Sequence, residues 1–140
     1  MSLLPDLRQI TISNSILKSF VDYHYNQITP EAHILILQHL DEDWLGSGRG
    51  RVAFRHKNYV VKIPYTTDGE RFNRIEAHTY KNYNTKGRLA RCRMHGIMLV
   101  MEYIEQIKDH NDLPLWVSYI DCEQVGYTRT GKLVAYDYGG

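Results

Sequence analysis

The stretch "LGSGRGRVAFRHKNYVVKIP", residues 45–64, decides the fold that this sequence predicts. Within it, "GRVAF" and "YVVKI" are rich in residues that favour strands, and "RHKN" between them suits a short hairpin connection. A third segment of the same kind, "IMLVMEYI", follows at residues 97–104. We therefore expect a mostly antiparallel sheet to start beside the glycines and to include all three segments.

Three closely spaced glycines, Gly46, Gly48 and Gly50, open this stretch. Without Cβ atoms, they let backbone N–H groups approach phosphate oxygens. The Gly-Lys-Ser/Thr ending of a P-loop is absent, and a strand follows where a dinucleotide fingerprint needs a helix. The pattern fits a glycine-rich hairpin above a nucleotide. A flexible turn that binds nothing is the open alternative.

Lys62 lies inside an apolar strand, where a charged amine is unfavourable unless a partner holds it. The next predicted element is a helix over residues 67–84, in which Thr67 and Glu70 have the spacing of a capping box. Glu76 lies in the middle of this helix. It shares a face with residues typical of packing: Phe72, Thr79, Tyr80 and Tyr83. We expect Lys62 to be the partner of Glu76; a sheet lysine and a helix glutamate that both face solvent are the alternative.

Two later predicted strands each lead into an acidic residue. The hydrophobic run "LVMEYIE", residues 99–105, leads into Glu102, Tyr103 and Ile104. The segment "VAYDYGG", residues 134–140, places Asp137 directly after a strand. Strands that simply leave the core would give the same pattern.

Residues 1–43 favour helices. Residues 13–25 place Ile16, Phe20 and Tyr23 on one face, with Leu17 close to it. Thr29 and Pro30 are a typical start for a second helix. Near the other end of the chain, we expect a short helix capped by Asp112, and then a hairpin formed by "QVGYT" and "KLVAY".

These elements predict an α+β fold in one domain over residues 1–140. Its parts are a helical segment (1–43), the glycines through the third strand segment (44–105), and a small remainder (106–140). The net charge of +1 gives no long-range attraction to nucleic acid or to an anionic membrane. The longest apolar run, "IMLVM", is too short to span a bilayer, and the start lacks a signal-peptide pattern. Two cysteines, Cys92 and Cys122, make no disulfide framework, so we expect a cytoplasmic protein.

Five segments together resemble the protein-kinase-like fold over residues 44–139. They match that family's glycine loop, strand lysine, helix glutamate, hinge and Asp-Phe-Gly segment, in this order: "LGSGRGRVAF", "VVKIP", "NRIEAHTY", "LVMEYIE" and "LVAYDYG". The resemblance implies that Lys62 pairs with Glu76 and holds the α- and β-phosphates of ATP. It also implies that Asp137 binds Mg²⁺ and that the hinge, at Glu102 and Ile104, reads the adenine edge.

The sequence departs from the family pattern at several positions. Gln124 stands at the metal-binding asparagine, and Tyr119 at the catalytic aspartate. Asp121 is the nearest carboxylate and the candidate catalytic residue, whereas Gln124 is a neutral candidate metal ligand. Arg51 takes the place of the third glycine.

The resemblance implies a miniature, truncated kinase-like fold with a minimal lower lobe. Residues 106–136 leave room for one helix, and with Gly140 as the last residue we expect no activation segment. The N-terminal helices could pack against the lower lobe and replace part of its core.

We expect a pseudokinase-like binding module that docks on a protein partner and keeps a cleft for ATP and Mg²⁺. Compact chains of this kind suit a phage or mobile element, with a host factor as the partner. Arg88, Arg91 and Arg93 could meet an acidic partner surface, or simply protect a sheet edge. Two other functions stay open: a small ATP-dependent phosphotransferase, and a helical adaptor whose glycines are only turns.

Overall fold

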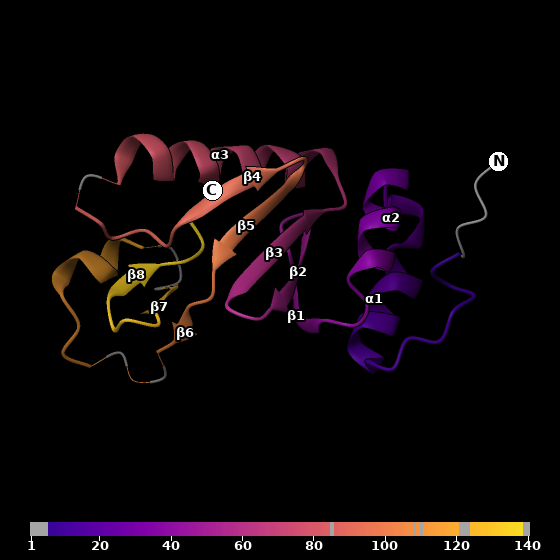
Figure 1. Ribbon diagram of the computed structural model, residues 1–140, viewed down its shortest axis with the longest axis horizontal. Helices are drawn as coiled ribbons and strands as arrows, with labels where there is room; N and C mark the ends of the chain where they lie inside the picture. Colours follow the sequence, from indigo (N-terminus) through magenta and orange to yellow (C-terminus); the bar gives the residue numbers. More distant parts are fainter. Residues whose placement is uncertain (1–5, 85, 108, 110, 121–123, 139–140) are drawn as a thin grey trace.

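The computed structural model describes residues 6–84, 86–107, 109, 111–120 and 124–138. Its helices are α1 (Ser15–His24), α2 (Pro30–Gln38) and α3 (Thr67–Tyr83), with short 3₁₀ helices η1 (Tyr25–Gln27) and η2 (Leu115–Tyr119) (Figure 1). Its strands are β1 (Asp43–Gly48), β2 (Arg51–His56), β3 (Tyr59–Pro64), β4 (Cys92–His95), β5 (Met98–Glu102), β6 (Glu105–Gln106), β7 (Val125–Tyr127) and β8 (Leu133–Ala135). Within the described residues, no helix combines the length and apolar character needed to cross a membrane.

Two antiparallel sheets confirm the predicted α+β class. The larger has five strands in the order β1-β2-β3-β5-β4, and the smaller has the order β6-β7-β8. The predicted hairpin of β2 and β3 forms, with His56 opposite Tyr59. The predicted final hairpin forms as well, with Gly126 opposite Val134. The strand β4 lies at an edge of the larger sheet.

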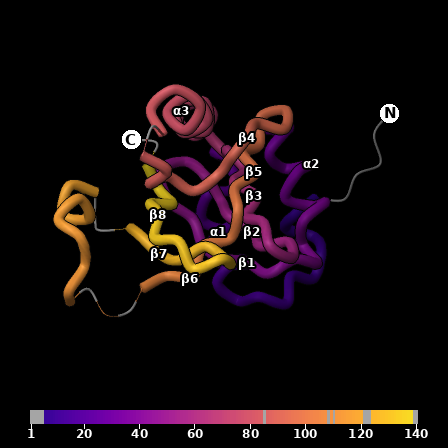
Figure 2. The backbone as a smooth tube through the Cα atoms, turned by 60° about the vertical axis from the view of Figure 1, so that its left-hand side comes forward, coloured from indigo at the N-terminus to yellow at the C-terminus, as the bar shows by residue number. Residues whose placement is uncertain are grey.

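The helices α1 and α2 cover one face of the five-stranded sheet. Their buried residues form one core with alternate residues of β2 and β3: Leu17, Phe20, Val21, Ala32, Ile36, Val52, Phe54, Val61 and Ile63. The expectation that these helices would pack against the lower part of the molecule is wrong. In Figure 1, both helices lie on the opposite side of the five-stranded sheet from β6, β7 and β8, and Figure 2 again shows β2 and β3 between α2 and β8. The apolar residues of β2 and β3 needed a cover, and the helices supply it.

The buried face of α1 differs from the predicted one. Phe20 and Leu17 are buried, but Ile16 is 69% exposed and Tyr23 is 84% exposed. Val21 completes the buried face instead. Both start signals of α2 are confirmed, since the Thr29 hydroxyl accepts the Ala32 N–H at 3.2 Å and Pro30 is the first helical residue.

The helix α3 begins one residue earlier than the predicted capping box implies. The hydroxyl of Thr66, not of Thr67, accepts a backbone N–H, that of Gly69, at 3.1 Å. The buried residues of α3 are Gly69, Asn73 and Glu76, whereas Tyr83 is 69% exposed. The predicted apolar face is therefore wrong, and the face on the sheet is largely polar.

The short helix after the large sheet also starts differently. η2 follows Pro114, with no side-chain cap, and Asp112 lies in the preceding turn with a φ of 60°. The prediction of Asp112 as a cap is therefore wrong. Cys122, Gly139 and Gly140 lie outside the described residues.

Candidate functional site

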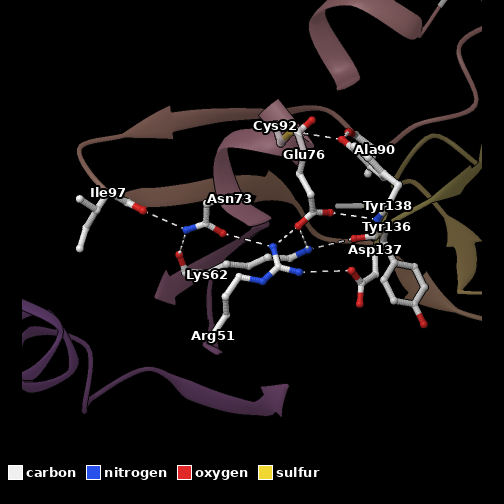
Figure 3. A network of polar contacts seen from close by, with 10 residues as sticks. All are labelled: Arg51, Lys62, Asn73, Glu76, Ala90, Cys92, Ile97, Tyr136, Asp137 and Tyr138. Carbon is white, nitrogen blue, oxygen red and sulfur yellow. Dashed lines mark hydrogen bonds and ion pairs between the residues drawn. The ribbon is translucent and has the colours of Figure 1, made fainter. Parts of the chain in front are cut away.

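Lys62 and Glu76 face each other on the side of the sheet away from α1 and α2. The Lys62 Nζ donates to the Glu76 Oε1 at 2.9 Å, which confirms the predicted ion pair (Figure 3). The register explains the geometry, because Lys62 lies opposite Ala53 on β2 and Leu99 on β5. Its neighbours Val61 and Ile63 point into the core under α1 and α2.

A second cation, Arg51, meets the same glutamate. Its guanidinium donates to Glu76 Oε1 and, at 3.2 Å, to the Asn73 Oδ1. It also reaches Asp137, whose Oδ1 is 3.3 Å from the Arg51 Nη2. The side chain of Arg51 is only 7% exposed. Lys62, Glu76, Arg51 and Asp137 thus form one charged cluster, which includes two cations and two anions.

Glu76 is the centre of this cluster and has no solvent exposure. Burial on its own would raise the pKa of its carboxyl, but the charges of Lys62 and Arg51 and their hydrogen bonds outweigh it. The pKa of Glu76 is therefore lowered from its ordinary value, and the carboxylate stays ionised.

The chain around Asp137 is held against this centre by its backbone. The Tyr138 N–H donates to the Glu76 Oε2 at 3.0 Å, and the Lys62 Nζ donates to the Tyr136 carbonyl at 3.1 Å. The Tyr138 hydroxyl donates to the Ala90 carbonyl at 2.7 Å. Asp137 itself keeps a side chain that is 33% exposed.

Asn73 ties α3 to the sheet. Its Nδ2 donates to the Lys62 carbonyl at 3.0 Å and to the Ile97 carbonyl at 2.9 Å. Since its Oδ1 accepts from Arg51, this one amide connects β3, the turn before β5 and the charged cluster. Its full burial is thus compensated by hydrogen bonds.

A cavity of about 730 Å³ opens beside the cluster. Its apolar walls include Leu45, Val52, Ala53, Val60 and Met101. Arg51, Lys62 and Asp137 line its charged part. An apolar cavity of this size with a few convergent polar groups is the usual form of a small-molecule site.

The three predicted glycines have different environments. Gly46 and Gly48 line the cavity, with open space where a Cβ would stand. Gly50 instead packs against the start of α3, where a methyl group on Gly69 would overlap the Gly50 carbonyl. That carbonyl accepts the Tyr65 N–H at 2.8 Å.

The hairpin turn itself is tight. Arg49 and Gly50 both have positive φ, 50° and 77°, and Gly48 pairs with Arg51 on either side of them. Two residues of positive φ are typical of the turn that best matches the twist of a hairpin. The tight turn fixes where β2 begins, and therefore where the Arg51 side chain points.

Glu102 and Ile104 both line the cavity, as the hinge prediction requires of them. The Glu102 carboxylate, however, accepts the N–H of Arg91, the residue before β4, at 2.8 Å. The N–H groups of Glu102 and Tyr103 donate to the carbonyls of Arg91 and Asn58, at 2.9 and 2.7 Å. A bound base would have to use other backbone groups of this segment.

The remaining candidates lie at the lower side of the cavity. Gln124 lines it, and its carbonyl accepts the Tyr136 N–H at 3.1 Å. Tyr119 also lines it and is 80% exposed. Asp121, the candidate catalytic residue, lies outside the described residues.

The sequence pattern did not identify two members of the site. In the sequence, Arg51 stands out only as a departure from a glycine pattern, and Asn73 does not stand out. A signal existed for Arg51, since it lies two residues before Ala53, which faces Lys62, and alternate strand residues share a face. Asn73 lies three residues before Glu76, on the same side of a helix.

No protein-family model matches this chain, and no curated protein or solved structure matches it. What the site does is therefore inferred from its own geometry and chemistry.

Proposed function

We propose that this protein is a pseudokinase-like module, with a protein-kinase-like arrangement of its strands, whose cavity binds a purine nucleotide and whose surface docks on a protein partner. The observation that carries the proposal is the Lys62–Glu76 ion pair at 2.9 Å, whose lysine lines the same cavity as Gly46 and Gly48. A buried carboxylate fixes the lysine amine, and the amine can then meet an anionic ligand at low entropic cost.

The cavity suits the parts of a nucleotide. Leu45, Ala53 and Val60 offer apolar contacts for a planar base. Lys62 offers a cation for the phosphates. Gly46 and Gly48 leave room for the phosphates to approach the backbone.

Binding is favoured over phosphoryl transfer by the residue at the predicted catalytic-base position. Tyr119 stands there, 80% exposed, and a phenol is a much poorer proton acceptor than the carboxylate that the kinase pattern has at this position. Transfer depends on positioning the attacking group and on neutralising charge. The alternative function is a small ATP-dependent phosphotransferase, which transfer of a radiolabelled γ-phosphate would reveal.

The test is thermal and chemical unfolding with and without ATP, on wild type, Lys62→Met and the control Lys81→Ala. Lys81 is exposed on α3. At a hundredfold excess over its dissociation constant, ATP should stabilise wild type and control by about 2.7 kcal/mol. Lys62→Met should lose this gain while remaining folded, because Arg51 still pairs with Glu76. No stabilisation at millimolar ATP would refute nucleotide binding, and transfer of a radiolabelled γ-phosphate would favour the enzyme.

The docking part of the proposal is supported by two exposed arginines at the edge of the sheet. Arg91 and Arg93 are exposed on or beside the edge strand β4, where they suit an acidic surface. Arg88 is only half-buried and lies over the Trp116 ring at 5.1 Å.

The test of docking is a pull-down in which wild type, Lys62→Met and Arg91→Glu/Arg93→Glu serve as baits. Equal recovery of one partner by wild type and Lys62→Met, lost in Arg91→Glu/Arg93→Glu, is expected. Recovery that depends on Lys62 would place the partner at the cavity instead.

A further inference from the structure

We infer that Arg51 takes the place of a divalent cation at Asp137, so that the cavity binds its nucleotide without metal. This inference rests on the proposed nucleotide function. The resemblance to kinases implies Mg²⁺ at Asp137, but the donor set here does not fit that ion. The Asp137 Oδ1 already accepts from the Arg51 Nη2 at 3.3 Å, and the second expected ligand, Gln124, is neutral (Figure 3).

The position of Arg51 is fixed by the fold. It follows the two-residue turn of Arg49 and Gly50, and it pairs with Gly48 on one side and Pro64 on the other. Its guanidinium is held by Glu76 and by the Asn73 Oδ1, which leaves the Nη2 directed at Asp137. A planar guanidinium held at three points keeps one orientation.

The charges of the cluster support the same conclusion. Arg51 and Lys62 balance Glu76 and Asp137, so the cluster is neutral without a metal ion. With glycine at position 51, as the kinase pattern has it, the cluster would carry one net negative charge beside Asp137. That charge would attract a divalent cation. With Arg51 present, the ion would lie next to a guanidinium, and the repulsion between them disfavours its binding.

The ligand that this arrangement fits is a nucleotide whose phosphates meet Arg51 and Lys62 directly. Both side chains line the cavity. A guanidinium has five N–H donors, and it forms strong, charge-assisted hydrogen bonds with phosphate oxygens. Asp137 is then a counter-ion that competes with the phosphates for Arg51, and not a metal ligand.

The test is isothermal titration of ATP in EDTA and in Mg²⁺, with wild type, Arg51→Ala and the control Arg74→Ala, at an exposed arginine of α3 that does not line the cavity. Wild type and control should bind equally well in both conditions. Arg51→Ala should bind about tenfold or more weakly in EDTA, because a charged hydrogen bond is lost. Mg²⁺ should restore its affinity, because Asp137 is released to bind the ion.

Asp137→Asn is the second variant, and it does not depend on Arg51→Ala folding. In EDTA it should bind ATP more tightly than wild type, because Arg51 loses a competing carboxylate. Weaker binding by Asp137→Asn, or a wild type that needs Mg²⁺ to bind, would overturn the metal-independent site while nucleotide binding stands. Failure of wild type to bind ATP in either condition would instead refute the proposed function.

Discussion

Glu76 is the residue on which the charged cluster depends, because it holds two cations with no exposure to solvent. Glu76→Gln should lower the free energy of unfolding at pH 7 by about 3–5 kcal/mol, since Arg51 and Lys62 lose their shared anion. Urea denaturation measures the loss. Glu105→Gln, on exposed β6, is the control and should change stability by less than about 0.5 kcal/mol. Equal values for the two variants would contradict a structural role for the cluster.

The lowered pKa of Glu76 also gives this residue a defined pH dependence. A carboxyl whose folded pKa lies below its unfolded value of 4.5 contributes stability that is fully present above pH 4.5. This contribution is lost as the pH falls through the lower, folded pKa. Wild type should therefore lose stability on acidification below pH 4.5, and the part of that slope due to Glu76 should be missing in Glu76→Gln. Denaturation curves at a series of pH values measure both slopes, and identical slopes would contradict the assignment.

At the level of single residues, the sequence predicted the Lys62–Glu76 pair because a charged residue in an apolar strand has few possible partners. The roles of Arg51 and Asn73 were not predictable in the same way. Each acts through a contact between distant segments, such as Arg51 with Asp137 and Asn73 with Ile97. Such contacts depend on strand register and on how α3 lies across the sheet, which residue types alone do not fix.

Among the elements, α3 offers a direct test of its starting point. The Thr66 hydroxyl accepts the Gly69 N–H, whereas the next residue, Thr67, is exposed. Thr66→Ala should lower the free energy of unfolding by about 1 kcal/mol, because an N-terminal amide loses its acceptor. Thr67→Ala is the matched control and should have a much smaller effect. Urea denaturation of both variants measures the difference, and a larger loss in Thr67→Ala would restore the capping box first predicted.

The strands were easier to predict than the faces of the helices. Runs such as "YVVKI" pair with strands on both sides, and their β-branched and aromatic residues identify them as strands. Helix faces were harder, since apolar residues at helical spacing compete for burial. In α1, Val21 is buried in place of Ile16 and Tyr23. In α3, the buried face is polar, because Asn73 is hydrogen-bonded to Arg51 and Glu76 is paired with Lys62 beneath the helix.

Across the whole molecule, the five-stranded sheet separates two functions. One face, with Val52, Phe54, Val61 and Ile63, is buried under α1 and α2. The opposite face carries Lys62 and the cavity. Because adjacent residues of β3 point to opposite faces, one strand contributes to the core and to the site alike. Val52 is where the two sides meet, since it belongs to the core and also borders the cavity.

This separation predicts that a large loss of stability on the helical side leaves the site intact. Phe20 is buried on α1, with its ring 5.1 Å from that of Tyr65 and 5.7 Å from that of Trp44. Phe20→Ala should lower the free energy of unfolding by about 3–5 kcal/mol. Tyr23→Ala, one turn further on α1 and 84% exposed, is the control and should cost less than about 0.5 kcal/mol.

The nucleotide affinity of Phe20→Ala, titrated at a temperature where the variant is still folded, is the decisive measurement. Phe20 does not line the cavity, so its truncation removes no side chain that a bound nucleotide would touch. The dissociation constant for ATP should therefore equal that of wild type and of Tyr23→Ala. Tyr65 connects Phe20 to the glycine hairpin, because its ring contacts that of Phe20 and its backbone N–H donates to the Gly50 carbonyl. A weaker affinity in folded Phe20→Ala would mean that α1 positions the glycine hairpin, and that the helices belong to the binding site as well as to the core.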